Sequence, residues 1–267
     1  MCRVLRVNRS TYYKFLKHKP SKRELDNQIY RKQILEIYTK ANKRLGVKSI
    51  KVILQRDYDT KISEGRIYRL MKNMALPKMA TVKPKTALKK TQKTYPQNLL
   101  NQKFYPDKPN QVWSTDFTYI SIGYKKYVYL CAILDLYSRK CIAWKLSHRM
   151  DAKLACDTLE LALNKRKIEE TLLFHSDQGS QFKARELRKI IDDNNIMHSF
   201  SKPGYPYDNA VTEAFFKYLK HRQINRKKYQ NIKQVQLDCF EYIENFYNNY
   251  NPHTANLGLT PNQKEEN

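Results

Sequence analysis

The sequence lacks any apolar run that approaches the ~18 residues of a membrane-spanning helix, and its first residues contain no apolar signal-peptide core. These two absences favour a cytoplasmic protein over one embedded in or exported across a membrane. Its five cysteines form no Cys-x-x-Cys pair, and its six histidines are scattered without the spacing of metal ligands. Both a disulfide framework and a zinc site are therefore disfavoured.

Acidic residues are scarce in the N-terminal part of the chain. Residues 1–100 hold 26 Lys and Arg against 6 Asp and Glu, whereas the rest holds 25 against 19. The formal net charge of +26 is therefore mostly N-terminal. Such a surplus indicates a polyanionic partner, because neutralising phosphates releases counterions and gives strong, salt-sensitive binding. A merely solvated surface, or one that binds an acidic membrane surface, would also be basic, but we favour nucleic acid.

The N-terminal region, residues 1–76, is predicted to be all-α and helix-turn-helix-like. The predicted main helices cover residues 24–39, 47–56 and 63–74. In the first of them, the apolar positions that recur at helical spacing are Ile29, Ile34, Leu35 and Tyr38. In the third, Arg66, Arg69 and Lys72 lie off the apolar face, so we expect them to contact DNA in the major groove. A small helical bundle that merely packs is the alternative.

Residues 77–108 show no hydrophobic period and are rich in Lys, Thr, Gln and Pro, which predicts a basic linker. From residue 109 the pattern predicts three antiparallel strands followed by alternating helices and strands. The expected strands are 112–122, 126–134, 139–146, 172–175 and 197–201, and the expected helices are 152–164, 183–194, 209–222 and 232–247. This order predicts an α/β, ribonuclease-H-like core over 109–267, with a mixed five-stranded sheet flanked by helices.

Two aspartates lie where strands of this core would present them. Asp116 shares one face of an apolar strand with Ser114 and Thr118, where a carboxylate is costly unless it is paired or binds a metal. Asp177 follows a buried strand at a turn into a helix, which is where open α/β sheets place ligands. A salt bridge for Asp116, or a helix cap for Asp177, would explain either residue taken alone.

A third acid, Glu213, is separated from Asp177 by 35 residues and lies on a helix that Asp208 or Asn209 can cap. Lys217 and Lys220 fall on the same helical face as Glu213, opposite the apolar face. An ordinary surface pair of Glu and Lys would show the same spacing. Taken jointly, we interpret Asp116, Asp177 and Glu213 as catalytic ligands of Mg²⁺ or Mn²⁺, because carboxylates without His or Cys suit hard cations. Two such ions could support phosphodiester chemistry on DNA.

The sequence resembles the orfB-type transposases of bacterial insertion sequences, which are DDE transposases with a retroviral-integrase-like catalytic core. The resemblance covers nearly the whole chain. It rests on the residues 113–119, 135–139, 175–182, 201–210, Glu213, Lys220, 250–253, 257–258 and 260–261, with 66–71 in the N-terminal region. The sequence departs from the usual family pattern at residues 45–47 and at Asn251, positions that concern local DNA contacts rather than the chemistry.

The resemblance implies that Asp116, Asp177 and Glu213 hold the metal ions and that Lys220 lies near DNA. It also implies cleavage at the terminal repeats of the element and strand transfer into target DNA, without a covalent protein intermediate. The expected partners are DNA, further copies of this chain assembled on DNA, and an upstream orfA-type protein or fusion, in the bacterial cytoplasm at the nucleoid.

Two other functions fit the same composition. A catalytically idle DNA-binding regulator of transposition would need the basic N-terminal region but not the triad. A ribonuclease-H-like nuclease would need the triad but not the segments of the DNA-joining family. The intact triad and these segments favour the transposase.

Overall fold

The computed structural model describes residues 7–17, 19–76, 98–102, 104–202 and 208–267. The chain divides into two compact units, Met1–Met79 and Ala80–Asn267. Most of the predicted linker, from Pro77 to Gln97, lies outside the described residues. Among the described residues, no helix combines the length and the apolarity that crossing a membrane requires.

The first unit contains a three-helix cluster formed by α2 (Lys22–Lys40), α3 (Val47–Tyr58) and α4 (Glu64–Asn73), preceded by the short α1 (Arg9–Leu16). Its core consists of one apolar face from each helix, namely Ile34, Ile37, Tyr38, Ile50, Ile53, Leu54, Ile67, Leu70 and Met71. Ser21 and Glu24 form a capping box that starts α2. Ser63 caps α4, because its side chain accepts the Arg66 N–H.

Two apolar positions of α2 do not lie where the sequence predicts them. Ile29 and Leu35 are about half exposed, whereas Ile37 is buried beside Ile34 and Tyr38. The inward face of α2 is narrow because α3 and α4 both contact this helix along one side. Apolar spacing alone therefore overestimates how much of this helix packs.

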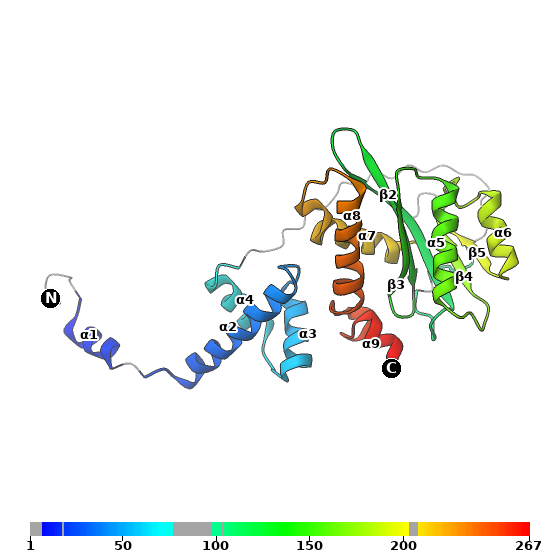
Figure 1. Ribbon diagram of the computed structural model, residues 1–267. Coiled ribbons are helices and arrows are strands. Elements are labelled where there is room, and N and C mark those ends of the chain that lie inside the picture. The colour runs from blue at the N-terminus through cyan, green and yellow to red at the C-terminus, as the bar shows by residue number, and fades with distance from the viewer. Residues whose placement is uncertain (1–6, 18, 77–97, 103, 203–207) are drawn as a thin grey trace. The chain divides into compact units, whose positions relative to one another are not determined.

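The second unit is built on a five-stranded sheet in the order β3-β2-β1-β4-β5 (Figure 1). The strands are β1 (Val112–Ser121), β2 (Tyr127–Asp135), β3 (Cys141–Ser147), β4 (Leu173–Ser176) and β5 (Met197–Phe200). The first three pair antiparallel, whereas β4 pairs parallel with both β1 and β5. This arrangement confirms the predicted mixed sheet of the ribonuclease-H-like fold.

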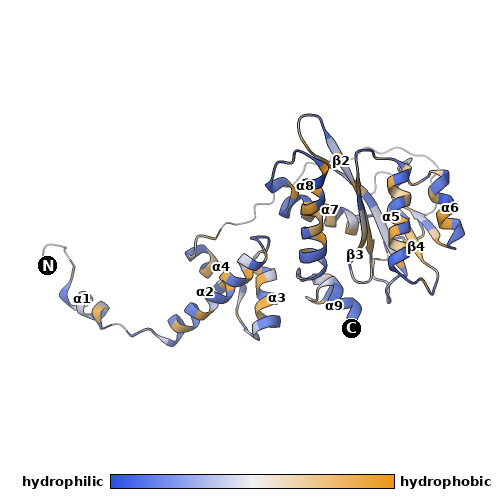
Figure 2. Cartoon of the chain, viewed as in Figure 1, coloured by the Kyte–Doolittle hydropathy of each residue, from blue (hydrophilic) through white to orange (hydrophobic). Residues whose placement is uncertain are grey.

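Helices cover both faces of this sheet. On one face, α5 (Ala152–Lys165) and α6 (Arg185–Asp193) enclose a core that includes Trp113, Phe174 and Phe182. Figure 2 shows apolar residues on the strands and on the sides of α5 and α6 that face this core. On the other face lie α7 (Ala210–Arg222), which contacts β1, and α8 (Ile232–Phe240), which contacts β3. The β1 face that carries Ser114 therefore meets α7.

The C-terminal part differs in detail from the single long helix predicted for residues 232–247. After α8 the chain continues as a π-helix, Glu241–Asn248, and ends in α9 (Pro261–Glu266), which the sequence analysis does not predict. Its start nevertheless has a local signal, because Thr260 and Gln263 form a capping box around Pro261 at the first helical position.

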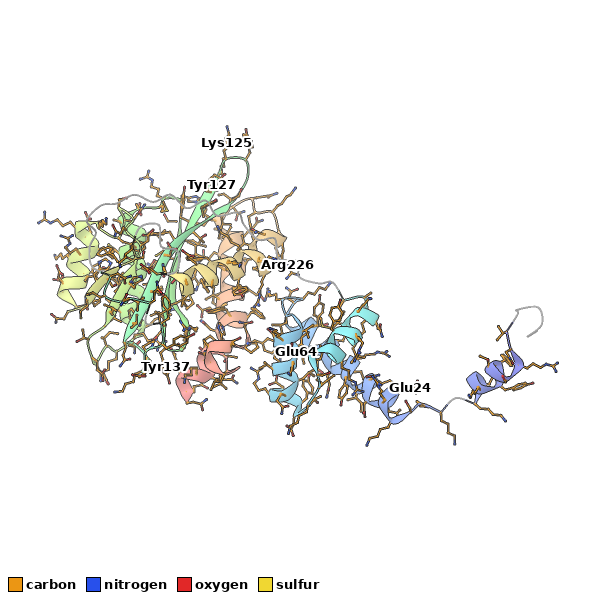
Figure 3. All side chains as sticks on the ribbon, turned by 180° about the vertical axis from the view of Figure 1, so that it is seen from behind. Glu24, Glu64, Lys125, Tyr127, Tyr137 and Arg226 are labelled. Atoms are coloured by element: carbon orange, nitrogen blue, oxygen red, sulfur yellow. The ribbon has the colours of Figure 1, made fainter. Side chains whose placement is uncertain are left out.

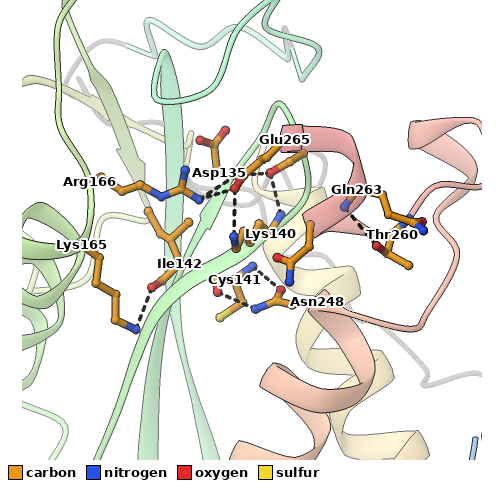
Figure 4. A network of polar contacts seen from close by, with 12 residues as sticks. Asp135, Lys140, Cys141, Ile142, Lys165, Arg166, Asn248, Thr260, Gln263 and Glu265 are labelled. Atoms are coloured by element: carbon orange, nitrogen blue, oxygen red, sulfur yellow. Dashed lines mark hydrogen bonds and ion pairs between the residues drawn. The ribbon is translucent and has the colours of Figure 1, made fainter. Parts of the chain in front are cut away.

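Side-chain contacts attach this C-terminal part to the turn between β2 and β3 (Figure 4). The Glu265 carboxylate accepts hydrogen bonds from Arg166 at 2.7 and 2.8 Å, from Lys140 at 3.0 Å and from Ser138 at 2.8 Å. The Asn248 amide bonds both backbone groups of Cys141, as a neighbouring strand would. The C-terminus therefore stabilises one edge of the sheet.

We predict that Glu265→Gln lowers the free energy of unfolding by about 1.5–3 kcal/mol at neutral pH, because charge-assisted bonds to Arg166 and Lys140 are lost. Burial opposes ionisation of Glu265, but these partners lower its pKa overall. The stabilisation is therefore present above the carboxyl pKa of the unfolded chain and disappears as the pH falls through the lowered folded value. Denaturant unfolding at several pH values measures it. The exposed neighbour Glu266 supplies the control Glu266→Gln, and equal stabilities of the two variants would contradict the prediction.

Candidate active site

The pairing of β1 with β4 brings two of the predicted catalytic residues to the same level of neighbouring inner strands. These strands run parallel with Ser114 opposite His175. Asp116 and Asp177 each follow two residues later, so they share a face and a level. The third acid arrives on α7, whose Thr212 lies 2.6 Å from Ser114, oxygen to oxygen. Glu213 is the next residue and is exposed to solvent.

Backbone groups orient both aspartates. The Phe117 N–H donates to Asp116 Oδ1 at 2.7 Å, and the Gly179 N–H donates to Asp177 Oδ1 at 2.8 Å. A methyl group on Gly179 would lie 2.9 Å from Asp177 Oδ1 and 2.8 Å from Gln181 Oε1. A larger residue at this position would therefore shift the end of the Gln181 or Asp177 side chain.

The three carboxylates influence one another electrostatically. Burial raises the pKa of Asp116 to about 7, and the charges of Asp177 and Glu213 contribute in the same direction. The Phe117 N–H and Lys220 oppose this shift. Partial burial also raises the pKa of Glu213. The site therefore concentrates negative charge where water is partly excluded, which a cation would relieve.

The carboxylates are nevertheless not arranged as a finished ligand set. Within the residues that the structure describes, no three His, Cys, Asp or Glu side chains are close enough together to hold a metal ion as they stand. The donor chemistry fits a hard cation, since all three groups are carboxylates.

Lys220 lies beside this site, as the sequence predicts. Its ammonium group is 4.4 Å from the centre of the Tyr119 ring. Burial lowers the pKa of Lys220, and the negative charge of Asp116 raises it. Lys217, one turn earlier on α7, is exposed. A cation is thus held next to the carboxylates, where a phosphate group of DNA could be held.

Asn209 does not lie where a DNA-contacting residue would. It is buried, and its amide donates to the Thr115 carbonyl at 3.0 Å. It occupies the N-cap position of α7 without making a side-chain capping bond. We therefore correct the expectation for this residue: it joins the start of α7 to β1.

Arg66 also has partners within its own unit. Its Nε donates to Asn27 Oδ1 at 3.0 Å, and its guanidinium lies 4.8 Å from the centre of the Tyr30 ring. These contacts attach α4 to α2, so part of its donor capacity is already used. Arg69 and Lys72 on the same helix are exposed, and their contact with DNA stays a prediction.

Asp208 is the residue that the sequence analysis undervalues. It is buried, and its carboxylate accepts hydrogen bonds from Asn98, Gln102 and the Lys202 N–H at 2.9, 3.1 and 2.9 Å. It therefore fastens the start of α7 to residues 98–102, which lie within the predicted linker. The only sequence signal is an acid directly before Asn209, which suggests a helix cap instead.

His175 and Asn251 have structural partners as well. His175 is fully buried, its Nδ1 lies 2.9 Å from Ser199 Oγ, and burial lowers its pKa to about 4. Asn251 accepts a hydrogen bond from Arg222 at 2.9 Å and contacts His253. Neither side chain is placed to meet DNA directly.

Comparison with known proteins agrees with this geometry. Residues 106–206 match the family described as Integrase core domain, residues 194–261 match a second family of the same description, and residues 24–85 match the HTH-like domain. Transposase InsF for insertion sequence IS3A of Escherichia coli (strain K12) is 32% identical over 274 aligned residues, covering 99% of this chain and 92% of that protein. The chain belongs to the IS3 family of transposases.

Other similarities to this IS3-family transposase are shorter or structural. A Lactococcus lactis protein named ATP-dependent protease is 70% identical over 96 residues, which cover 36% of this chain and 31% of that protein. The chain thus spans less than a third of that relative, and we transfer no activity from it. The HTLV-2 integrase catalytic core domain in complex with magnesium aligns with a TM-score of 0.45 at 16% identity, covering 60% of this chain and 98% of that one.

We predict that Asp116→Asn stabilises the transposase at pH 8. A carboxyl of the unfolded chain ionises near its ordinary pKa of 3.8, whereas folding raises the pKa of Asp116 to about 7. The ionised form therefore destabilises the fold increasingly between these pH values, by about 1–3 kcal/mol after allowance for solvent screening. The advantage of the variant should shrink as the pH falls to 4. Denaturant unfolding measures it, with the exposed Asp193→Asn as control, and a pH-independent difference would contradict the assignment.

Proposed function

We propose that this transposase cleaves DNA at the ends of its insertion sequence and joins those ends to target DNA, with Asp116, Asp177 and Glu213 as the catalytic residues. The observation that supports this most is that Asp116 on β1 is influenced by the charges of Asp177, which follows β4, and of Glu213 and Lys220 on α7. Divalent ions held by the three residues, two Mg²⁺ or Mn²⁺, would activate the attacking oxygen and stabilise the leaving one.

The protein's own residues supply position and electrostatics. Asp116 is fixed by β1 and by the Phe117 N–H, so it presents the same oxygen throughout the reaction. Glu213 is exposed on α7 and is free to turn toward the DNA. Lys220 provides a positive charge next to the carboxylates, where it would bind a phosphate adjoining the scissile one. These groups would orient the phosphodiester and hold its charge in a partly dry site.

The proposed partners follow from the charge of the chain. The basic N-terminal region, residues 1–76, and the core, residues 109–267, would both bind DNA. This DNA would be the terminal repeats of the element and the target. Binding would take place in the bacterial cytoplasm at the nucleoid. We also propose assembly of several copies on DNA and cooperation with an upstream orfA-type protein. A catalytically idle regulator is disfavoured, because such a protein has no use for the partly buried Asp116, whose ionisation reduces stability and is opposed by the charges of Asp177 and Glu213.

We expect that Asp116→Asn, Asp177→Asn and Glu213→Gln each reduce strand transfer by at least about 10³-fold, because each removes a charged ligand from the reacting centre. DNA binding in chelator should persist. The assay follows joining of labelled element ends to a plasmid in Mg²⁺ or Mn²⁺, with and without the upstream protein. The surface variant Asp193→Asn should join normally, and joining by any triad variant at wild-type rate would refute the proposal.

We also expect the salt dependence of DNA binding to come partly from the N-terminal unit. In the full chain, Arg69→Ala and Lys72→Ala should each lower the slope of log affinity against log salt by about 0.9, the value for one lost phosphate contact. Fluorescence anisotropy of duplex DNA at several salt concentrations measures the slope. Lys167→Ala is the control, because Lys167 is exposed in the other unit and bonds Glu169. Unchanged slopes in both test variants would remove α4 from the DNA interface.

A further inference from the structure

A row of exposed tyrosines lies beside the catalytic carboxylates. Tyr119, Tyr124 and Tyr127 are 61%, 85% and 44% exposed and all belong to the β1–β2 hairpin. The Tyr119 and Tyr127 rings meet edge to face with 5.6 Å between their centres. Figure 3 shows Lys125 and Tyr127 on the projecting end of this hairpin, far from Tyr137 at the other end of β2. Exposed aromatic rings gathered in one place mark a candidate binding surface.

Side-chain contacts connect these rings to Lys220, whose charge acts on Asp116. Lys220, which interacts with Asp116, has its ammonium group over the Tyr119 ring. Tyr119 in turn contacts Tyr127. A ligand that bonds Lys220 through a phosphate would therefore meet the tyrosine rings with its next groups.

Beyond Tyr127 the surface is hollowed. A groove of about 380 Å³ is lined by residues of the hairpin, of the end of β3 and of the loop before α8, namely Ile122, Lys126, Tyr127, His148, Gln230, Asn231 and Ile232. It offers an aromatic ring, two amide side chains and a lysine within one concavity. Such a lining provides a stacking surface together with hydrogen-bond donors and acceptors for a base edge.

The charged residues beside the groove indicate which class of ligand it binds. Residues 121–134 and 223–237, which include both loops that border the groove, contain no Asp or Glu. Lys125, Lys126 and Lys228 are exposed in these loops, whereas Lys227 is paired with Asp238 at 2.9 Å. Cations combined with exposed rings suit single-stranded nucleic acid, which brings a phosphate and a stacking base in each nucleotide.

We propose that Tyr119, Tyr127 and this groove bind unpaired nucleotides of the DNA end next to the scissile phosphate. Lys220 holds the phosphate nearest the carboxylates, the tyrosine rings stack on the bases, and the groove receives the base farthest from the site. This inference rests on the proposed function, which places the scissile phosphate at Asp116. It adds that the enzyme separates or captures unpaired DNA at the end it cuts.

The test compares the affinity of the full chain for two DNA probes in chelator, where no chemistry occurs. One is a blunt duplex, and the other is the same duplex with a short oligothymidine tail, 3′ or 5′. The wild-type protein should prefer one tailed probe. Tyr127→Ala should lower the affinity for that probe by roughly 5- to 100-fold with little change for the blunt duplex, the range expected for one lost stacked base. Tyr127→Phe should retain the preference, because it keeps the ring.

Tyr137→Ala is the control, since Tyr137 lies at the opposite end of β2 and has Lys264 over its ring, as Tyr119 has Lys220. A photoreactive thymidine in the tail should crosslink to the hairpin. Wild-type protein without tail preference, or Tyr127→Ala with an undiminished one, would overturn the inference. Tail preference in a protein that joins no DNA would instead refute only the proposed function, because binding in chelator needs no catalysis.

Discussion

Everything in the catalytic unit depends on the parallel pairing of β1 with β4. Placing Ser114 opposite His175 fixes the level at which Asp116 and Asp177 leave the sheet, and a shift of one residue would turn Asp116 into the α5 core. The pairing joins only three residues of each strand, so it needs support from a neighbouring helix. The buried Ser114–Thr212 contact and the Asn209–Thr115 hydrogen bond provide it from α7, the helix that also carries Glu213.

The rest of the fold can be understood as compensation for the repelling carboxylates. Their ionisation in a partly buried place opposes folding, and that cost must be offset by contacts elsewhere. The apolar core under α5 and α6 contributes most, since it buries Trp113, Phe174 and Phe182. The C-terminal segment adds the charged bonds of Glu265 and the strand-like pairing of Asn248, which hold the far edge of the sheet.

The sequence was sufficient for features determined locally and insufficient for those that join distant segments. Strand and helix positions follow from apolar periodicity, and Asp116 and Asp177 follow from where carboxylates interrupt or end apolar strands. The pairing of Asp208 with residues 98–102 and the burial of Asn209 have no local signature, because their partners lie about a hundred residues away. The same holds for Arg66, whose exposure depends on Asn27 and Tyr30 of another helix.

The contacts of Asp208 connect residues 98–102 with the start of α7. A buried carboxylate is tolerated only while its donors remain in place. Those donors are Asn98, Gln102 and the backbone of Lys202, while Ser199 Oγ accepts the N–H groups of Leu99 and Leu100. Displacing residues 98–102 would leave Asp208 buried without two of its donors. Residues 98–102, held on β5 by Ser199, therefore help to stabilise the first turn of α7, the helix that carries Glu213.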